Sequence, residues 1–246
     1  MNELKIGFGK YIEGFYKSLS PTTKAMEEFV ARGLEKSIVF APSRMVDAAE
    51  DMLASWRKND NNGDGKSTPF LPVIIVATGK DYLPATGDYS IQKGEPEYVV
   101  LPADPKNRVF KMRQMHGDRR AQLVIFSADE PTARSIAAQF SLYCSRYVNR
   151  RFSATYRFAG FDLGFPVMLE STDIPATNVT TEQKNLTILA IDLSLRETIP
   201  LFNYPLAGEA NDGLGILGDP NDPCGYSLVV EVAVLDENTG VIRVVN

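Results

Sequence analysis

The chain has 246 residues, of which 44% are hydrophobic, and a formal net charge of −5. This length and composition can bury one large core and exclude disorder on a large scale. The acidic balance, and aromatic residues that are not interleaved with basic ones, count against a nucleic-acid-binding protein. Apolar runs such as residues 73–77 are far shorter than the roughly 20 residues that cross a bilayer, so no membrane partner is expected.

The N-terminus and the cysteines point to a protein that stays in a reducing compartment. Residues 1–10 lack the basic start, apolar centre and cleavage site of an export signal. Cys144 and Cys224 are too few for a framework of disulfides. Glycosylation patterns at Asn178 and Asn185 are therefore expected to stay unused.

The N-terminal third predicts two helices followed by a strand. Ser20 and Pro21 supply a cap and a first helical residue for a helix near 21–39, in which apolar residues recur at helical spacing. A second amphipathic helix is expected near 42–57. Residues 70–77 have the length and β-branching of a buried strand.

The rest of the chain predicts one helix among several strands. Residues 78–107 are rich in Gly and Pro and predict a long loop with a short strand at 98–101. Asp129 and Pro131 begin a helix over 131–150, whose apolar stripe extends to Tyr147 and Val148. The expected strands are 109–115 and 121–126, joined as a hairpin at 116–118, then 153–158, 167–170, 186–199, and a closing hairpin of 227–235 with 241–244.

Together these elements predict an α+β fold: a mostly antiparallel sheet flanked by amphipathic helices, with long loops and a C-terminal β-hairpin. We expect residues 1–204 to form a single domain. Residues 205–246 are expected to add a loop and the hairpin, packed on the same domain or on a neighbouring subunit.

Charge is unevenly distributed along the chain. Residues 106–157 hold eleven basic and three acidic side chains, a formal charge of +8, whereas residues 158–246 hold thirteen acidic and three basic ones, a charge of −10. These segments either neutralise each other within one fold or join copies head to tail, in contacts that can close into a ring. The second interpretation predicts a subunit interface that includes Arg113, Arg119, Arg120, Arg146, Arg150, Arg151, Asp212, Asp219 and Asp222.

One motif resembles the opening of a calcium loop. Asp60, Asn62 and Asp64 could supply oxygens at alternate positions, before Gly65. Leu71 stands where a bidentate glutamate should close the loop, and a strand is expected to follow it. A solvated loop is the favoured interpretation, and a calcium site at these residues is the alternative.

A second motif matches the dinucleotide fingerprint, with glycines at 213, 215 and 218. That fingerprint requires a strand before it and a helix after it to receive the pyrophosphate. Prolines at 205, 220 and 223 surround the motif instead. We therefore expect a flexible or docking loop, and no cofactor.

The remaining candidates for catalysis do not form a recognisable set. His116, the single histidine, falls in the expected hairpin turn, where no triad or zinc site can be assembled around it. Asp162, Glu170 and Asp173 could pair for acid–base work, but scattered carboxylates are more often solvated. No catalytic residue is predicted, and the chain is not expected to be an enzyme.

From residue 108 to 202 the order of elements resembles the tail terminator and neck proteins of long-tailed bacteriophages, especially contractile ones. The resemblance rests on the alanine- and glutamine-containing helix segment 133–139, the Asp173-Ile-Pro175 turn, and the long strand 187–200 that ends in Ile-Pro.

The resemblance implies a structural virion protein, assembled in the host cytoplasm. It implies a six-membered ring that caps the tail tube and sheath and joins them to the head connector, so the expected partners are other copies of the chain, tail tube and sheath proteins, and head connector proteins. An acidic surface facing the channel could let DNA pass without specific binding. Terminator, gateway and another neck ring all remain open.

Two other classes also remain open. One is a soluble enzyme that uses Asp/Glu chemistry or binds calcium at the 60–65 loop. The other is a sheath or tube component of a contractile injection machine, which would differ in its partners rather than in its chemistry.

Overall fold

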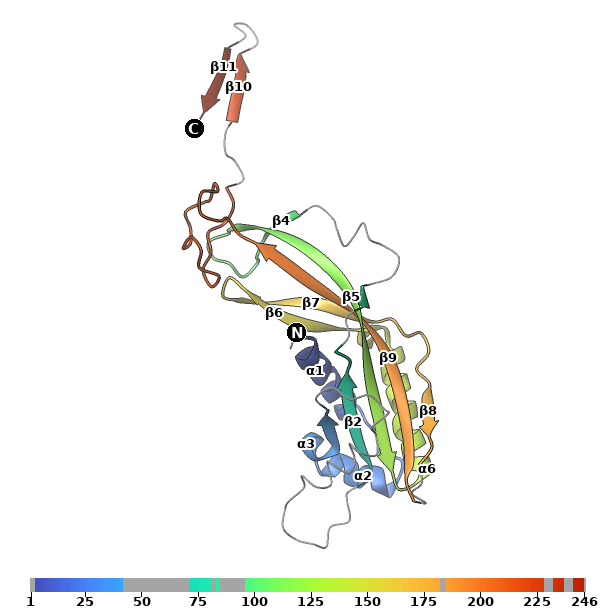
Figure 1. Ribbon diagram of the computed structural model, residues 1–246. Helices are drawn as coiled ribbons and strands as arrows, with labels where there is room; N and C mark the ends of the chain where they lie inside the picture. Colours follow the sequence, from blue (N-terminus) through green and yellow to red (C-terminus); the bar gives the residue numbers. More distant parts are fainter. Residues whose placement is uncertain are drawn as a thin grey trace. The chain divides into compact units, whose positions relative to one another are not determined.

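The computed structural model describes residues 3–41, 71–80, 83–84, 96–181, 185–227, 232–236 and 241–245 (Figure 1). Its helices are α1 (Glu3–Lys17), α2 (Lys24–Ala31), α3 (Leu34–Ser37) and α6 (Glu130–Ser145), with a short 3-10 helix η2 (Tyr147–Asn149). Its strands are β1 (Ile38–Phe40), β2 (Val73–Thr78), β3 (Leu83–Pro84), β4 (Glu97–Val100), β5 (Val109–Ser127), β6 (Arg151–Phe158), β7 (Phe161–Leu169), β8 (Ala176–Val179), β9 (Thr187–Asn203), β10 (Val232–Asp236) and β11 (Val241–Val245).

Nine of the described strands form one sheet. Strands β1, β2, β5, β9, β7 and β6 lie side by side in that order, β3 and β4 pair with β5, and β8 pairs with β9. Strand β1 runs parallel to β2, while β2, β3 and β4 run antiparallel to β5, and β7 and β8 antiparallel to β9. Strands β10 and β11 form a separate antiparallel pair. The predicted α+β fold with a mostly antiparallel sheet and a C-terminal hairpin is confirmed.

The contacts within the chain divide it into two compact units. Unit 1 comprises residues 1–87, 116–155 and 164–198, and unit 2 comprises residues 88–115, 156–163 and 199–246. Strands β5, β6, β7 and β9 each have residues in both units. The expected boundary between residues 204 and 205 stays a prediction.

Helix α1 in unit 1 was not expected from the sequence. Its buried side packs on α6, where the Tyr11 hydroxyl donates to Cys144 Sγ at 3.2 Å and the rings of Phe15 and Phe140 meet edge to face at 4.9 Å. A Cβ at Gly7 would lie 2.5 Å from the carbonyl oxygen of Ser153. Glycine at this position therefore lets the helix backbone approach strand β6 closely.

The expected helix over 21–39 is wrong in its extent. Thr23 caps α2 by accepting a hydrogen bond from the backbone of Met26, but the helix stops before Gly33, whose φ is +89°. After the short α3, the chain enters β1, where Ile38 pairs with Ile74. A left-handed glycine and β-branched residues beside an available strand thus end the helical pattern. The helix expected near 42–57 lies outside the described residues.

The expected hairpin over 109–126 is also wrong, because β5 is one strand of 19 residues. The supposed turn at 116–118 lies in its middle, where Gly117 and Asp118 pair with β3. Neighbouring strand β9 supplies partners for the polar residues here: Arg196 Nε lies 3.0 Å from Asp118, and Thr198 lies 3.3 Å from His116. Those cross-strand contacts let a polar sequence continue as strand.

The expected helix over 131–150 begins as predicted and ends early. Asp129 Oδ1 accepts a hydrogen bond from the backbone of Thr132 at 2.8 Å. The buried stripe is correct as far as Cys144, but α6 ends at Ser145 and η2 follows. Tyr147 and Val148, expected in the core, are 78% and 71% exposed.

The other predicted strands correspond to described ones. Segments 70–77, 98–101, 153–158, 167–170 and 186–199 match β2, β4, β6, β7 and β9, although β7 and β9 are several residues longer than expected. Strand β8 was not expected. The long loop at 78–107 contains β3 and β4, and its residues 81–82 and 85–95 lie outside the described part.

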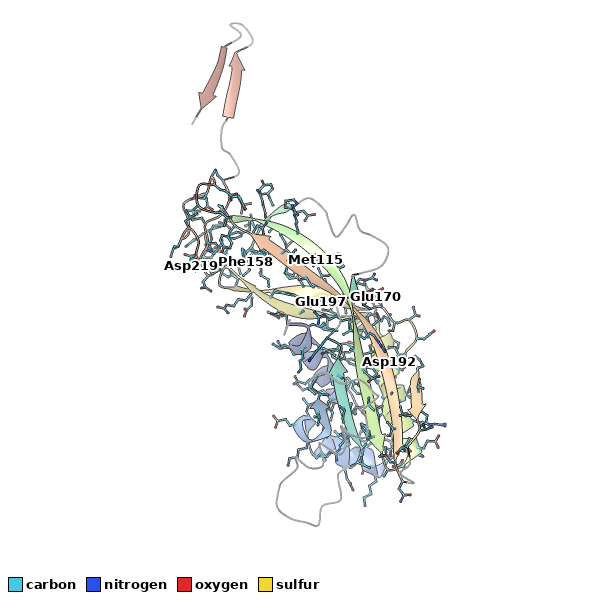
Figure 2. The ribbon with its side chains drawn as sticks, in the orientation of Figure 1. Met115, Phe158, Glu170, Asp192, Glu197 and Asp219 are labelled. Carbon is cyan, nitrogen blue, oxygen red and sulfur yellow. The ribbon has the colours of Figure 1, made fainter. Side chains whose placement is uncertain are left out.

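A buried ion pair joins β5 to β9 in unit 1. Arg119 Nε lies 2.9 Å from Glu197 Oε2, and both side chains are almost fully buried. Figure 2 labels Glu197 within the sheet. Removing one partner of a buried pair leaves the other charge buried without a partner, which is strongly destabilising. Replacing both partners by apolar groups is often neutral or stabilising.

We therefore expect Arg119→Ala to lower the free energy of unfolding by about 3–5 kcal/mol. The double variant Arg119→Met/Glu197→Leu should recover much of that loss. Denaturant titration measures both. The control is Arg120→Ala, since Arg120 is exposed and lies 3.6 Å from Asp192, and this change should cost less than about 1 kcal/mol. Equal losses for Arg119→Ala and Arg120→Ala would contradict the assignment.

Candidate subunit interface

The structure gathers no metal-binding group in its described residues. No three His, Cys, Asp or Glu side chains there come together as metal ligands. The calcium-like residues Asp60, Asn62 and Asp64 lie outside the described part of the chain, so that site stays an untested alternative.

The glycine motif at 213–218 lies in an irregular loop between β9 and β10. The backbone of Ile216 donates to Asp222 at 2.7 Å, and the backbone of Asp219 donates to Ile216 at 3.1 Å. Gly213 and Gly218 both have positive φ. The motif therefore forms turns rather than the strand-to-helix junction that a pyrophosphate site requires.

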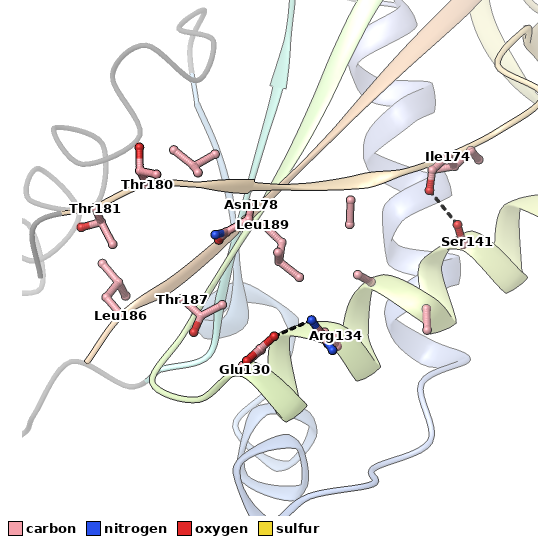
Figure 3. Close-up of a pocket in the computed structure, with 14 residues that line it drawn as sticks. Glu130, Arg134, Ser141, Ile174, Asn178, Thr180, Thr181, Leu186, Thr187 and Leu189 are labelled. Atoms are coloured by element: carbon pink, nitrogen blue, oxygen red, sulfur yellow. Dashed lines mark hydrogen bonds and ion pairs between the residues drawn. The ribbon is translucent and has the colours of Figure 1, made fainter. Parts of the chain in front are cut away.

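Unit 1 contains a groove of about 790 Å³ between α6 and strands β8 and β9 (Figure 3). Its charged lining residues, Glu130 and Arg134, pair with each other at 2.6 Å. Ser141 in its wall donates to the carbonyl of Ile174 at 2.9 Å. The other lining residues are aliphatic, threonine or asparagine: Ala137, Ala138, Ala176, Asn178, Val179, Thr180, Thr181, Leu186, Thr187 and Leu189.

Much of the charge asymmetry in the sequence is neutralised inside the chain. Five residues of the basic segment 106–157 pair with carboxylates of the acidic segment 158–246. These pairs are Lys106–Asp222, Arg108–Asp222, Arg119–Glu197, Arg120–Asp192 and Arg157–Asp162. For these residues the structure favours neutralisation within one fold over pairing between copies.

A charged network in unit 2 anchors the loop after β9. Arg108 is buried, and its guanidinium donates to Asp104 Oδ2 at 2.8 Å, to Asp222 Oδ1 at 2.6 Å and to the carbonyl of Pro223 at 2.6 Å. Lys106 reaches the same Asp222 carboxylate at 2.8 Å. The sequence did not single out Arg108 or Asp104, because their spacing of four residues has no motif that marks it.

This network shifts the pKa values of both carboxyl groups. Burial alone would raise the pKa of Asp104, but hydrogen bonds from the Arg108 side chain and from the backbone of Lys106 and Arg108 outweigh it and hold the pKa below its usual value. The hydrogen bond from Lys106, reinforced by Arg108, likewise lowers the pKa of Asp222. Both carboxylates are therefore stabilised in their charged form.

Exposed apolar side chains surround the end of α6. We call Leu142, Tyr147 and Val148 the helix-end patch; all three are exposed. Arg146 and Arg151 lie beside them, and the Arg151 guanidinium stands 5.5 Å from the centre of the Tyr147 ring. The sequence placed Tyr147 and Val148 in the buried stripe of a longer helix, and they are exposed because α6 ends at Ser145.

A second exposed apolar group lies in unit 2. We call residues 205–223 the apolar loop; within it Leu206, Leu214, Ile216 and Leu217 are all exposed, Ile216 to 59%. The sequence indicated a flexible or docking loop at the glycine motif, but it did not show that the apolar side chains of this loop face solvent.

The nine predicted interface residues fall into three groups. Arg119 is buried, and Arg120 and Asp222 pair within the chain. Arg113, Arg146 and Arg151 are exposed, while Arg150 is half-buried and donates to the carbonyl of Leu169 at 2.9 Å. Asp212 accepts hydrogen bonds from the backbone of Leu214 and Gly225, and Asp219 accepts one from the backbone of Asn221.

Searches of protein-family models and of curated proteins find no match to this chain. Among the described helices, none has both the length and the apolar character needed to cross a membrane.

We expect Arg108→Ala to loosen the apolar loop, because it removes the donor that joins Asp104 to Asp222. Amide hydrogen exchange of residues 205–227 should accelerate by at least about tenfold, since more than one charge-assisted hydrogen bond is lost. Lys106→Ala is the matched control: its amine is partly exposed, and the buried contacts of Arg108 remain, so exchange should change little. Unchanged exchange in Arg108→Ala would disprove the anchoring role.

The same network predicts loss of stability in acid. Because the folded-state pKa of Asp104 lies below its unfolded value, its contribution is fully present above the unfolded pKa of about 3.9 and disappears as pH falls through the lower folded pKa. Arg108→Ala should therefore reduce the change in unfolding free energy between pH 5 and pH 2. Parallel pH profiles for the wild-type chain and the variant would contradict this.

Proposed function

We propose that this chain is a structural subunit that assembles with copies of itself into a ring, as in the neck of a contractile phage tail. In that role the ring caps the tail tube and sheath, in the manner of a tail terminator, and joins them to the head connector. The phage assignment is supported by the resemblance over residues 108–202. The assembly is supported by features of the fold.

The observation that carries the proposal is the C-terminal hairpin. Among the described strands, β10 and β11 pair only with each other, with Val232 opposite Val245 and Asp236 opposite Val241. Apart from Asp236 and Arg243, the sequence of both strands is apolar. A two-stranded hairpin is marginally stable in water and needs a further strand or an apolar surface to cover it. A neighbouring copy in a ring can supply that surface.

The acidic balance of the chain suits the passage of DNA through the ring. Carboxylates on a channel wall repel phosphate, so DNA would slide without specific binding. The partners in this proposal are other copies of the chain, in a ring of six, and the tube, sheath and connector proteins of the virion.

Electron microscopy of the purified full-length chain tests the proposal, together with light scattering to measure mass. We expect closed rings with a central hole and a mass near that of six chains. A chain that remains monomeric at high concentration would refute the proposal, and so would tight, salt-dependent binding of the isolated protein to DNA.

A second prediction concerns the hairpin itself. The substitution Val234→Asp replaces an apolar residue of strand β10 by a charged one. In the register of the hairpin this position lies opposite Arg243. We expect it to reduce the ring fraction by about tenfold or more while the thermal midpoint of the nine-stranded fold stays close to that of the wild-type chain. Light scattering and circular dichroism measure the two quantities. Thr177→Asp, on exposed strand β8, is the control and should leave ring formation unchanged.

A further inference from the structure

We infer that the helix-end patch of one copy binds the apolar loop of the next copy. This inference rests on the proposed ring and specifies the two surfaces that meet in it. One surface belongs to unit 1 and the other to unit 2, and the charged residues beside them are of opposite sign. The contact is therefore heterologous: every copy offers both surfaces, and successive copies join head to tail.

The apolar loop is held in a fixed conformation that displays its aliphatic side chains. Besides the turns around Ile216, the backbone of Asp212 donates to Gly225 at 3.0 Å. A Cβ at Gly215 would overlap the backbone of Pro223, so the loop is closed against itself. The buried Arg108 anchors it through Asp222. A loop with this many internal bonds, which still leaves large apolar side chains in water, has the properties of a preorganised binding surface.

The helix-end patch is also held in a fixed conformation. Asn149 Nδ2 donates to the carbonyl of Tyr143 at 2.9 Å, and the backbone of Asn149 donates to Arg146 at 2.9 Å. These bonds fix η2 and with it Tyr147 and Val148. Leu142 of the patch also lines a hollow of about 380 Å³, together with Ser145 and Ile174. An aliphatic side chain such as Ile216 or Leu217 can enter a hollow of that size.

The charges around the two surfaces are complementary. Arg146, Arg150 and Arg151 surround the helix-end patch, with Asp173 as the acidic residue that lines the adjoining hollow. The apolar loop carries Glu209, Asp212 and Asp219, and the sequence has no lysine or arginine from 205 to 227. Asp222 is already paired inside the chain. The helix-end patch is thus an apolar centre with a basic rim, and the apolar loop is an apolar centre with an acidic rim. This complementarity favours a second copy of the chain as the partner over DNA, because the acidic loop would repel phosphate.

Cysteine cross-linking between two populations of full-length chain tests the pairing. One population carries Val148→Cys and the other Ile216→Cys, and the native Cys144 and Cys224 are buried. Under mild oxidation we expect a cross-linked pair of chains in the mixture, with at least about tenfold less in either population alone. Ile6→Cys mixed with Ile216→Cys is the matched control, since Ile6 is also exposed but lies on α1, and it should not cross-link. Equal cross-linking in the control mixture would overturn the inference.

Substitution at the centre of each surface gives an independent measurement. Tyr147→Asp and Ile216→Asp should each weaken self-association by about tenfold or more, while circular dichroism shows the wild-type fold. If wild-type chains form rings and both variants form them equally well, the inference fails and the proposed ring stands. If wild-type chains form no ring, the proposed function fails. If Tyr147→Asp instead abolishes binding to DNA and leaves assembly intact, the helix-end patch is a nucleic-acid surface and the inference is wrong.

Discussion

The lateral pairing of β5 with β9 is the constraint on which the rest of this structure depends. Midway along β5 the sequence places histidine, glycine, aspartate and arginine in succession, which alone would favour a turn. Strand β9 supplies partners of opposite charge: Arg196 pairs with Asp118, and Glu197 pairs with Arg119. The buried contact between Glu197 and Arg119 holds the two strands together. With β5 extended, β2, β3 and β4 all pair along it, so one strand organises most of the sheet.

The same pairing changes the meaning of the charge asymmetry. A segment of +8 followed by one of −10 suggests surfaces that join separate molecules, but several of these charges meet across neighbouring strands or within one unit. The charged surface left for the proposed contact between copies is smaller and more localised. Arginines surround the end of α6, carboxylates lie along the apolar loop, and each group borders exposed apolar side chains. In the proposed contact, the apolar centres would supply affinity, and the charged rims would supply specificity and orientation.

Local signals predicted those elements whose pattern matched their final environment. The cap at Asp129 located the start of α6, and β-branched runs located β2 and β9. Predictions failed where a distant partner outweighed the local pattern. Strand β1 formed within an expected helix because β2 lies beside it, and β5 continued through an expected turn because of β9. For the candidate interface, the sequence indicated charged residues such as Arg146 and Arg151, but it did not predict that Tyr147 is exposed.

The sequence by itself determined the α+β class, the mostly antiparallel sheet, the closing hairpin and the opposite charges of segments 106–157 and 158–246, because periodicity and composition are properties of neighbouring residues. Only the tertiary structure decided which charges are buried, as at Arg108 and Arg119, and which apolar residues stay in water, as at Tyr147 and Ile216. Burial depends on contacts between segments far apart in the chain. A residue's local pattern contains no information about the partner that will cover it.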